Sequence, residues 1–356
     1  MNFNETIFLT GFPGFIAGRL VERLAGPKTQ FFLLVQKNFI EKALKDAAVI
    51  AEKTGTPLDN FALIEGDITR QNLGLSEADL EAVRAETTDV FHLAAIYDLA
   101  VEKEIAYRVN VEGTKNVNEL VRSMPNLRRY NYISTCYVAG ERKGTIFENE
   151  LEHDAGFRNF YEETKYLAEV EVERLKEELP VTIFRPSVVC GDSRTGETAK
   201  YDGIYYVIKF LLRSPEVFRL VNVGNDRVRL NLVPVDFVVD GMVALARDEN
   251  AAGKTIALAD PNPLTTKEIC DDIAEAITNK KTVLTPPPRL VETFLNLPIS
   301  PPLTGLPHSG VPYFFVPQSY DTSISEQLLE PHGVSCPNFG EYVKNLVKFV
   351  EDHPKL

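Results

Sequence analysis

The chain has 356 residues, of which 44% are hydrophobic, and its formal net charge is −13 at pH 7. This composition supports one large domain, or a core with a smaller lobe, and excludes an intrinsically disordered chain. The negative charge argues against a nucleic-acid partner. No apolar run approaches the ~20 residues that a membrane span needs, so we expect no span.

The cysteines and histidines point to no metal or disulfide framework. The four cysteines are widely spaced without a CxxC pair, and the five histidines form no HExxH pattern. Isolated reduced thiols are typical of a cytoplasmic protein, and this histidine spacing predicts no metal site. Because the chain starts only a few residues before an apolar run at 7–9, we expect no signal peptide and a cytoplasmic location.

Apolar runs and amphipathic stretches alternate through the first half of the chain. The apolar runs predict six buried strands, at residues 7–9, 31–35, 61–64, 90–93, 129–133 and 181–184. Helical spacing predicts helices at 19–24, 39–53, 76–86, 102–124 and 161–179. Strands that alternate with helices indicate an α/β, doubly wound parallel sheet of the Rossmann type. Ligands of such sheets bind at the carboxyl ends of the strands.

The stretch TGFPGFIAG, residues 10–18, joins the first predicted strand to the first predicted helix. In this context a glycine motif is typical of a dinucleotide site, although a glycine turn without a ligand is the alternative. Gly11 allows the tight turn, and Gly14 lets the backbone approach a pyrophosphate at the helix N-terminus. Ala17 replaces the usual third glycine and is small enough for close packing. The predicted cofactor-binding residues of this turn are Thr10, Gly11, Phe12, Pro13, Gly14, Phe15 and Ile16.

Three polar residues near the fifth strand could carry chemistry. Tyr161 and Lys165 are four residues apart at the start of a predicted helix, which places them on one face. The lysine can stabilise the phenolate of the tyrosine and can bind a ribose hydroxyl. Thr135 follows the fifth strand, and its hydroxyl can donate to a carbonyl oxygen as charge develops there. The alternatives are an exposed surface pair and hydroxyls that cap backbone groups; we expect capping from Ser134 and catalysis from Thr135.

The chain resembles the extended short-chain dehydrogenases/reductases over residues 6–243. The motifs that carry the resemblance are TGFPGFIAG, GDIT (66–69), HLAA (92–95), RVNVEGTKNV (108–117), IST (133–135), YEETK (161–165) and RPSVVCGDSRTGE (185–197). FRPSVVCGDSRTGE and NLVPVDFVVDGM look most like the branch that holds fatty acyl-CoA reductases and thioester reductases. The resemblance implies that Thr135, Tyr161 and Lys165 are the catalytic set.

The resemblance also implies further cofactor contacts. Residues 67 and 68 would lie beside the adenine, 93–95 beside the central part of the cofactor, and 186–189 along the nicotinamide, and Asn110 would help to order the site. These residues are Asp67, Ile68, Leu93, Ala94, Ala95, Asn110, Pro186, Ser187, Val188 and Val189. His92 and Arg185 are interpreted as structural residues.

The end of the second strand bears on the choice of cofactor. An NAD enzyme of this kind usually has an acidic residue there, which binds the ribose 2′-hydroxyl. This chain has Gln36 and Lys37 instead, and Lys37 could pair with a 2′-phosphate. We therefore expect NADPH rather than NAD. Arg19 is a second, weaker candidate for the phosphate contact, and a solvated Lys37 is the alternative.

The pattern changes after residue 190. We predict a loop at 191–202, helices at 204–212, 236–247 and 339–351, and a strand at 228–233. Residues 286–317 are rich in proline with interleaved apolar residues, which predicts a stiff segment without regular structure. This segment is either an irregular surface connection or an apolar wall or lid over a substrate. We expect residues 1–190, with parts of 228–260, to form the dinucleotide-binding domain, and 191–227 with 261–356 to form a substrate-binding lobe.

The resemblance favours an NADPH-dependent reductase of an apolar acyl thioester, aldehyde or ketone. The acyl group would be carried on coenzyme A or on a separate carrier protein. The alternatives are a sugar-nucleotide epimerase or dehydratase, a hydroxysteroid-type dehydrogenase, and a dinucleotide-binding sensor without activity. We also expect a homodimer that pairs through the helices at 102–124 and 161–179; the resemblance to acyl reductases, many of which are monomers, implies a monomer as the alternative.

Overall fold

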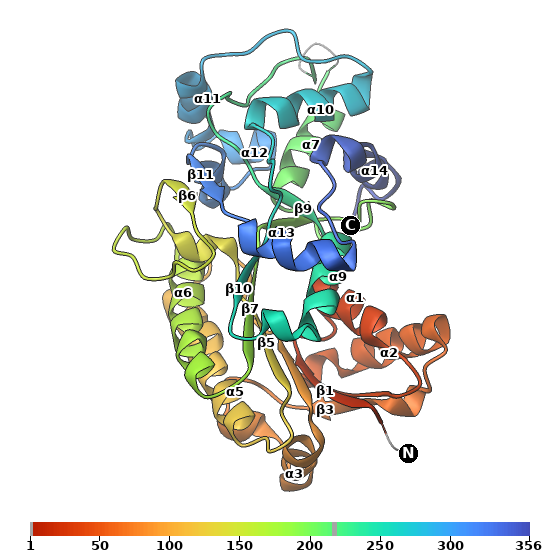
Figure 1. Ribbon diagram of the computed structural model, residues 1–356. Coiled ribbons are helices and arrows are strands. Elements are labelled where there is room, and N and C mark those ends of the chain that lie inside the picture. Colours follow the sequence, from red (N-terminus) through yellow and green to blue (C-terminus); the bar gives the residue numbers. More distant parts are fainter. Residues whose placement is uncertain (1–2, 216–218) are drawn as a thin grey trace.

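A seven-stranded parallel sheet forms the centre of the molecule (Figure 1). The computed structural model describes residues 3–215 and 219–356. The sheet has the order β10-β7-β5-β4-β1-β2-β3 and parallel pairing throughout, which confirms the predicted α/β fold. Its strands are β1 (Glu5–Thr10), β2 (Thr29–Val35), β3 (Phe61–Glu65), β4 (Asp89–His92), β5 (Arg129–Ile133), β7 (Val181–Pro186) and β10 (Thr255–Leu258).

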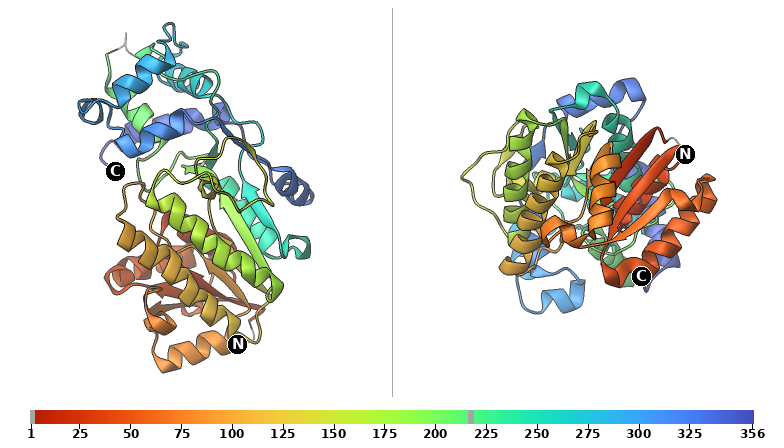
Figure 2. Two further views of the ribbon diagram at one scale, coloured as in Figure 1. Left: turned by 90° about the vertical axis from the view of Figure 1, so that its left-hand side faces the viewer. Right: turned by 90° about the horizontal axis from the view of Figure 1, so that it is seen from below.

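Helices cover both faces of the sheet, as expected for strands that are buried on both sides. On one face lie α1 (Phe15–Leu24), α2 (Ile40–Thr54) and α9 (Val235–Ala246), and on the other α3 (Glu77–Glu86), α5 (Gly113–Arg122) and α6 (Phe160–Glu173). The helices α5 and α6 run side by side along their face (Figure 2). The chain reverses its direction across the sheet between β1 and β4, and this is where a doubly wound sheet binds its ligand.

The predicted helix at 102–124 is not uniform. It consists of α4 (Lys103–Ala106), a π-helical stretch at Tyr107–Glu112 and then α5. A π-helical turn widens the helix locally, and such turns are frequent at functional sites. The predicted helix at 161–179 likewise gives way to a 3-10 helix, Arg174–Glu177, after α6.

Two strand predictions need correction. The seventh strand, β10, was not predicted; it lies after residue 190, beyond the region in which strands and helices alternate regularly. The predicted strand at 228–233 is mostly irregular, and only β9 (Leu232–Pro234) pairs with β8 (Val188–Cys190). The Asn225 side chain accepts hydrogen bonds from the backbone of Arg227 and Val228, and such local bonds compete with strand pairing.

The C-terminal helices gather at one end of the sheet (Figure 1). They are α7 (Ile204–Arg213), α10 (Thr266–Thr278), α11 (Pro288–Leu295), α12 (Ser300–Thr304), α13 (Ser323–Leu329) and α14 (Phe339–Asp352). A small apolar core joins α7, α10 and α14. The strands β6 (Gly144–Ile146) and β11 (Gln318–Tyr320) form a separate parallel pair. No helix of the described residues is both long enough and apolar enough to cross a membrane.

The proline-rich segment is more regular than predicted. It contains α11, α12 and a 3-10 helix at His308–Phe314. Pro288 and Pro301 lie in the first turns of α11 and α12. A backbone N–H in the first turn has no acceptor within the helix, so proline loses no hydrogen bond there, and its fixed φ suits a helix. The remaining 3-10 helices are Lys37–Phe39, Leu58–Asn60, Gln71–Gly74, Cys136–Ala139, Glu249–Ala251 and Glu330–His332.

Candidate active site

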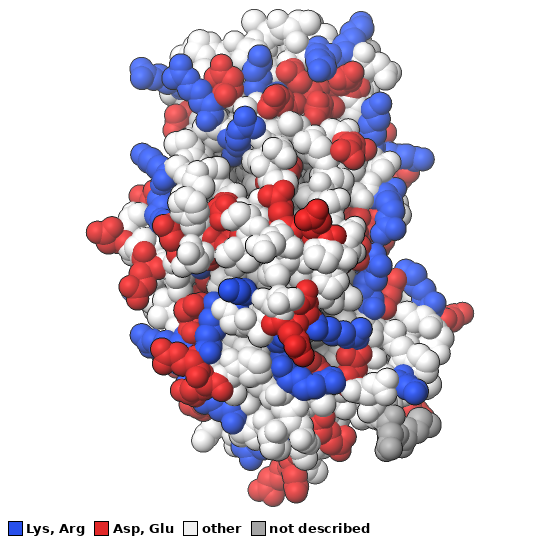
Figure 3. All heavy atoms as spheres, viewed as in Figure 1, with Lys and Arg blue, Asp and Glu red and all other residues white. Residues whose placement is uncertain are grey.

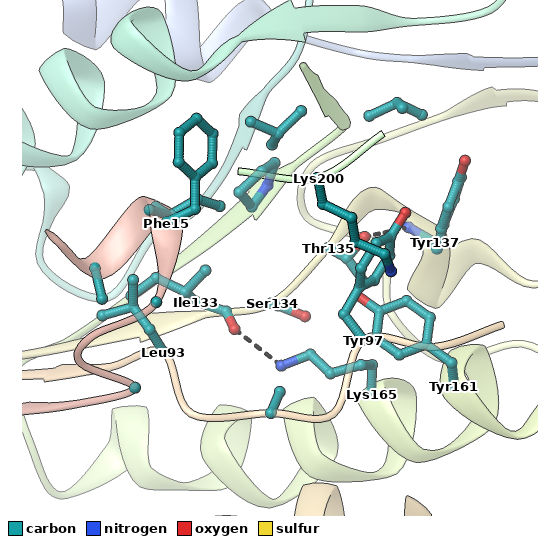
Figure 4. A pocket seen from close by; sticks show the side chains of 18 of the residues that line it. Phe15, Leu93, Tyr97, Ile133, Ser134, Thr135, Tyr137, Tyr161, Lys165 and Lys200 are labelled. Carbon is teal, nitrogen blue, oxygen red and sulfur yellow. Dashed lines mark hydrogen bonds between the residues drawn. The ribbon is translucent and has the colours of Figure 1, made fainter. Parts of the chain in front are cut away.

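A cavity of about 390 Å³ lies at the carboxyl ends of the central strands (Figure 4). It brings together most of the predicted site residues: Gly11, Gly14, Phe15, Ile16, Leu93, Ala94, Ala95, Thr135, Tyr161, Lys165, Pro186, Ser187, Val188 and Val189. A second cavity of about 100 Å³ extends from it toward the C-terminal helices, with Leu306, Tyr313 and Phe314 in its wall. Residues of the dinucleotide-binding part and of the C-terminal part of the chain thus line two adjoining cavities.

The glycine turn leaves no room for larger side chains. Gly11 has a φ of +97°, and a Cβ atom there would lie 3.0 Å from the backbone nitrogen of Ala94. A Cβ atom on Gly14 would lie 2.7 Å from the carbonyl oxygen of Gly11. The turn therefore keeps bare backbone facing the cavity just before α1, whose N-terminal N–H groups favour an anion. These features fit the pyrophosphate of a dinucleotide.

Thr10 and His92 support this turn from below. The Thr10 hydroxyl lies 2.7 Å from His92 Nδ1 and accepts a 3.1 Å hydrogen bond from the Ala94 backbone. His92 Nε2 lies 3.1 Å from the hydroxyl of Thr114. Burial, aided by the charge of Lys165, lowers the pKa of His92 to about 3. A neutral, hydrogen-bonded imidazole agrees with the interpretation of His92 as a structural residue.

Thr135 and Tyr161 meet at the wall of the larger cavity (Figure 4). Burial raises the pKa of Tyr161 well above its usual value, and a hydrogen bond with Thr135 partly offsets this rise. The Thr135 hydroxyl also accepts a 3.2 Å hydrogen bond from the Tyr137 backbone, so this residue caps a turn as well as facing the phenol. Ser134 instead points away from Tyr161 and donates to the Glu169 carboxylate.

Lys165 lies behind the phenol, one helical turn along α6. Its ammonium donates a 2.9 Å hydrogen bond to the Ile133 carbonyl oxygen and another of 2.9 Å to the Tyr132 hydroxyl. Burial lowers the pKa of Lys165 to about 8, although the charge of Glu169 acts in the opposite direction. Lys165 can therefore change its charge near neutral pH, which suits a residue that tunes a neighbouring phenol.

Asn110 and Arg185 hold the surrounding segments in place. Asn110, in the π-helical stretch, accepts a 2.9 Å hydrogen bond from the Ile96 backbone and donates a 3.0 Å bond to the Thr164 hydroxyl. It thus ties the loop after β4 to the residue next to Lys165. Arg185 forms a buried ion pair with Glu169 at 2.5 Å, as expected for a structural residue.

Eight predicted cofactor residues do not line the larger cavity: Thr10, Phe12, Pro13, Gln36, Lys37, Asp67, Ile68 and Asn110. Gln36 and Lys37 are exposed just after β2. The Asp67 carboxylate accepts from the backbone and hydroxyl of Thr69. Phe12 is buried in the core between the sheet and α1. Whether these residues touch a bound cofactor therefore stays a prediction.

Two arginines near the site are engaged elsewhere. Arg19 forms ion pairs with Asp192 at 3.0 Å and with Glu197 at 2.9 Å. This pairing weakens Arg19 as a candidate for a 2′-phosphate contact. Arg194, in the loop after β8, lies 3.9 Å from Asp236.

Several cavity residues were not predicted. Tyr97 follows the HLAA motif, and its ring meets that of Tyr161 edge-on at 5.2 Å. Tyr137, Lys200 and Asp202 line both cavities, and Lys200 reaches from its loop toward Tyr97 (Figure 4). Tyr97, Lys200 and Asp202 come from loops and Tyr137 comes from a short 3-10 helix, where no periodic pattern marks them. For Tyr97 and Tyr137 the single available signal was their position shortly after strand-end motifs.

The reversal of the sheet order and the glycine turn beneath a Thr–Tyr–Lys group define an extended short-chain dehydrogenase/reductase. The model of the male sterility protein family, a family of NAD-binding domains, matches residues 9–242. This is more than half of the chain, and the chain belongs to that family.

Curated relatives and solved structures agree with this assignment. Fatty acyl-CoA reductase wat of Drosophila melanogaster is 27% identical over 281 residues, which cover 69% of this chain and 54% of the relative. The chain thus spans about half the length of this relative. The terminal R domain of the myxalamid PKS-NRPS pathway superposes with a TM-score of 0.82 at 23% identity, over 99% of this chain and 92% of that one. A thiolation-reductase di-domain of an archaeal non-ribosomal peptide synthetase gives a TM-score of 0.76 at 19% identity, over 98% and 76% of the two chains.

Proposed function

We propose that this protein is an NADPH-dependent oxidoreductase that reduces the carbonyl group of an apolar acyl thioester, aldehyde or ketone. The observation that carries the proposal is the meeting of the Thr135 and Tyr161 hydroxyls at the cavity wall, with the Lys165 ammonium behind them. A protein that only binds a dinucleotide has no need of all three groups.

Each of the three residues has a distinct role in the proposed reaction. A bound NADPH supplies the hydride. Thr135 and Tyr161 donate hydrogen bonds to the carbonyl oxygen of the substrate, where negative charge develops. The buried phenol alone is a weak acid, because burial raises its pKa. The positive charge of Lys165 counteracts this effect and makes proton donation easier.

The residues 191–227 and 261–356 form the substrate-binding lobe in this proposal. The smaller cavity supports it, since the lobe contributes Leu306, Tyr313 and Phe314 to an apolar wall next to Tyr137. The proline-rich segment is thus a wall of the site rather than a surface connection. The names of the relatives favour a thioester on coenzyme A or on a separate carrier protein.

A sugar-nucleotide epimerase is the main enzymatic alternative, and the cavities argue against it. Such an enzyme must bind a nucleoside diphosphate outside the cofactor site. Among the residues that line the smaller cavity, Lys200 is the one with a permanent positive charge, and Asp202 lies 3.3 Å from its ammonium. On the face in Figure 3, acidic and basic side chains are interspersed, which also fits a partner other than nucleic acid.

A substrate screen with purified protein tests the proposal. NADPH oxidation should be followed with acyl-CoAs, aldehydes and ketones of graded length, and uridine diphosphate sugars should be tested with NAD. We expect NADPH consumption with an apolar carbonyl compound. Turnover of a sugar nucleotide alone would support the epimerase, and NADPH binding without any turnover would support the sensor.

Light scattering would test the proposed homodimer, which a mass near the 39.9 kDa of one chain would contradict.

A further inference from the structure

We propose that Tyr132 is a positioning residue, which holds the Lys165 ammonium between the sheet and the cofactor site through its hydroxyl and its ring. The inference rests on the proposed function for the role of Lys165 in the reaction. The positioning itself can be tested without any substrate.

The geometry of the contact is specific. Tyr132 is 1% exposed and precedes the last residue of β5. Its hydroxyl lies 2.9 Å from Lys165 Nζ, and the same nitrogen lies 4.6 Å from the centre of the tyrosine ring. A cation near an aromatic ring and bonded to its hydroxyl is held by two kinds of attraction at once.

The contacts of the Lys165 ammonium leave one of its N–H groups available. A lysine ammonium has three N–H groups. Two of them are used by Tyr132 and by the carbonyl oxygen of Ile133, which is visible in Figure 4. The third is left for the cavity side, where a ribose hydroxyl would be bound. A flexible four-carbon side chain is thereby restricted before the cofactor arrives, which lowers the entropy cost of binding.

The other charged and titratable groups around Lys165 do not replace this contact. Glu169, the nearest carboxylate along α6, is already bonded to Arg185 and to Ser134. His92 of β4 has a pKa of about 3 and is neutral. The phenol of Tyr161 lies on the cavity side. Among the hydrogen bonds of the described residues, Tyr132 is the one side chain to which Lys165 donates.

Tyr132 is also linked to the glycine turn that follows β1. The Thr114 hydroxyl lies 3.1 Å from His92 Nε2, on the strand next to β5. His92 bonds to Thr10, the first residue of the glycine motif, and its ring lies 5.6 Å from that of Tyr132. Buried polar groups linked in this way fix one another in place. The Lys165 ammonium is therefore positioned relative to the same turn that would hold the pyrophosphate.

Tyr132→Phe tests the proposal, because it keeps the ring and removes the hydroxyl. Tyr130→Phe is the matched control. Tyr130 lies two residues earlier on the same face of β5, is fully buried, and donates its hydroxyl to Asn118 at 2.8 Å, away from Lys165. Both changes remove one buried hydroxyl from the same strand, so a purely structural effect should appear in both variants.

The first measurement uses the protein without cofactor. The Cε resonance of Lys165 is followed by NMR against pH in lysine-labelled protein and assigned with Lys165→Arg. The titration midpoint, which lies at a pKa of about 8, should move to lower pH by about 1 in Tyr132→Phe, because the ammonium loses a hydrogen-bond acceptor. It should stay in place in Tyr130→Phe. In addition, Tyr132→Phe should weaken NADPH binding by roughly 2- to 10-fold, the cost expected for ordering one flexible side chain on binding.

The outcomes separate this proposal from the proposed function. Equal Lys165 midpoints and equal NADPH affinities in the two variants would overturn the role of Tyr132, whatever the substrate is. A shifted midpoint without turnover of any carbonyl compound in the wild type would support the positioning and contradict the reductase. If Tyr132→Phe does not fold, the wild type still decides: the ε-methylene protons of Lys165 should show a nuclear Overhauser effect to the ring protons of Tyr132, and the absence of this effect would overturn the contact.

Discussion

The Tyr313 hydroxyl, which comes from the proline-rich segment, donates a 2.6 Å hydrogen bond to the Glu162 carboxylate in the first turn of α6. Glu162 follows Tyr161 directly, is fully buried and is paired with Arg158 at 2.9 Å. The Tyr313 hydroxyl also accepts a 2.8 Å bond from Asn159, the N-cap of α6. The lobe is thus attached to the helix that carries the proposed acid, immediately beside that acid.

Tyr313→Phe should loosen this attachment. The variant loses a bond to a buried carboxylate, so we expect the free energy of unfolding to fall by about 1–3 kcal/mol. The apparent KM for the carbonyl substrate should rise, whereas NADPH affinity should change little, because Tyr313 lines the smaller cavity and not the larger one. Urea unfolding and steady-state kinetics measure both effects. Tyr201→Phe is the control, since the Tyr201 hydroxyl binds the His353 carbonyl at 2.8 Å, elsewhere in the lobe. An equal rise of KM in the control would contradict the assigned role.

The choice of cofactor should depend on Lys37. NADPH should bind more tightly than NADH, and Lys37→Ala should cost about 1–3 kcal/mol of NADPH affinity if the side chain forms a charge-assisted bond with the 2′-phosphate. Lys37 is exposed after β2 and free to approach such a group. Lys45→Ala is the control, because Lys45 pairs with Glu41 on the surface of α2. Calorimetric titration with both cofactors measures the difference, and tighter binding of NADH would refute the prediction.

The sequence predicted six of the seven strands of the central sheet because they lie before residue 190, where strands and helices alternate regularly. It did not predict β10, which lies after residue 190, where this alternation ends. The helices of the proline-rich segment were missed for a different reason. Proline was interpreted as a helix breaker, although Pro288 and Pro301 stand in first turns, where proline is compatible with a helix.

In the candidate site, the sequence likewise predicted what depends on spacing along the chain and missed what depends on contacts between distant segments. Spacing along one helix placed Tyr161 and Lys165 together, and Thr135 was added from its position after the fifth strand and from the family resemblance. The partners of Lys165 depend on side-chain contacts between β5 and α6, which no local pattern encodes. For the same reason Tyr313, about 150 residues further along the chain, could not be assigned to the first turn of α6 from the sequence.

A pH-dependent stability should arise from Glu148. Burial raises the pKa of its carboxyl to about 7, although the backbone N–H groups of Ala257, Ile324 and Ser325 donate to it and act in the opposite direction. Because the folded-state pKa lies above the ordinary value of 4.5, the folded protein binds more protons than the unfolded chain between these two values. Glu148 therefore contributes stability below the lower value, and this contribution is lost as the pH rises through about 7.

The variant Glu148→Gln checks this inference, because a neutral amide does not titrate. The free energy of unfolding of the wild type, relative to that of the variant, should fall as the pH is raised from about 4.5 to about 7. Glu150→Gln is the control, since a hydrogen bond from Arg142 lowers the pKa of Glu150, so its contribution changes below pH 4.5, in the opposite direction, and stays nearly constant between about 4.5 and about 7. Chemical unfolding at several pH values gives the comparison. A constant difference between wild type and Glu148→Gln would show that Glu148 does not titrate in this range.

The chemical step should depend most strongly on Tyr161. Tyr161→Phe keeps the buried ring but removes the hydroxyl that faces Thr135. Turnover should fall by roughly 10²–10⁴-fold, which is the usual contribution of a positioned acid, while NADPH affinity should change little.

Thr135→Val should also lower turnover without weakening NADPH binding, as the loss of one hydrogen-bond donor to an oxyanion does. Lys165→Ala should impair both, because the lysine acts on the phenol and on the ribose.

Comparing two substrate classes makes the Tyr161 test sharper. After hydride transfer, an aldehyde leaves an alkoxide that must take up a proton, whereas a thioester adduct can expel a thiolate. The fall in turnover of Tyr161→Phe should therefore be larger with an aldehyde than with a thioester of the same chain length. Single-turnover measurements with both compounds isolate hydride transfer from product release. Near-normal turnover of the aldehyde by Tyr161→Phe under these conditions would show that another group supplies the proton.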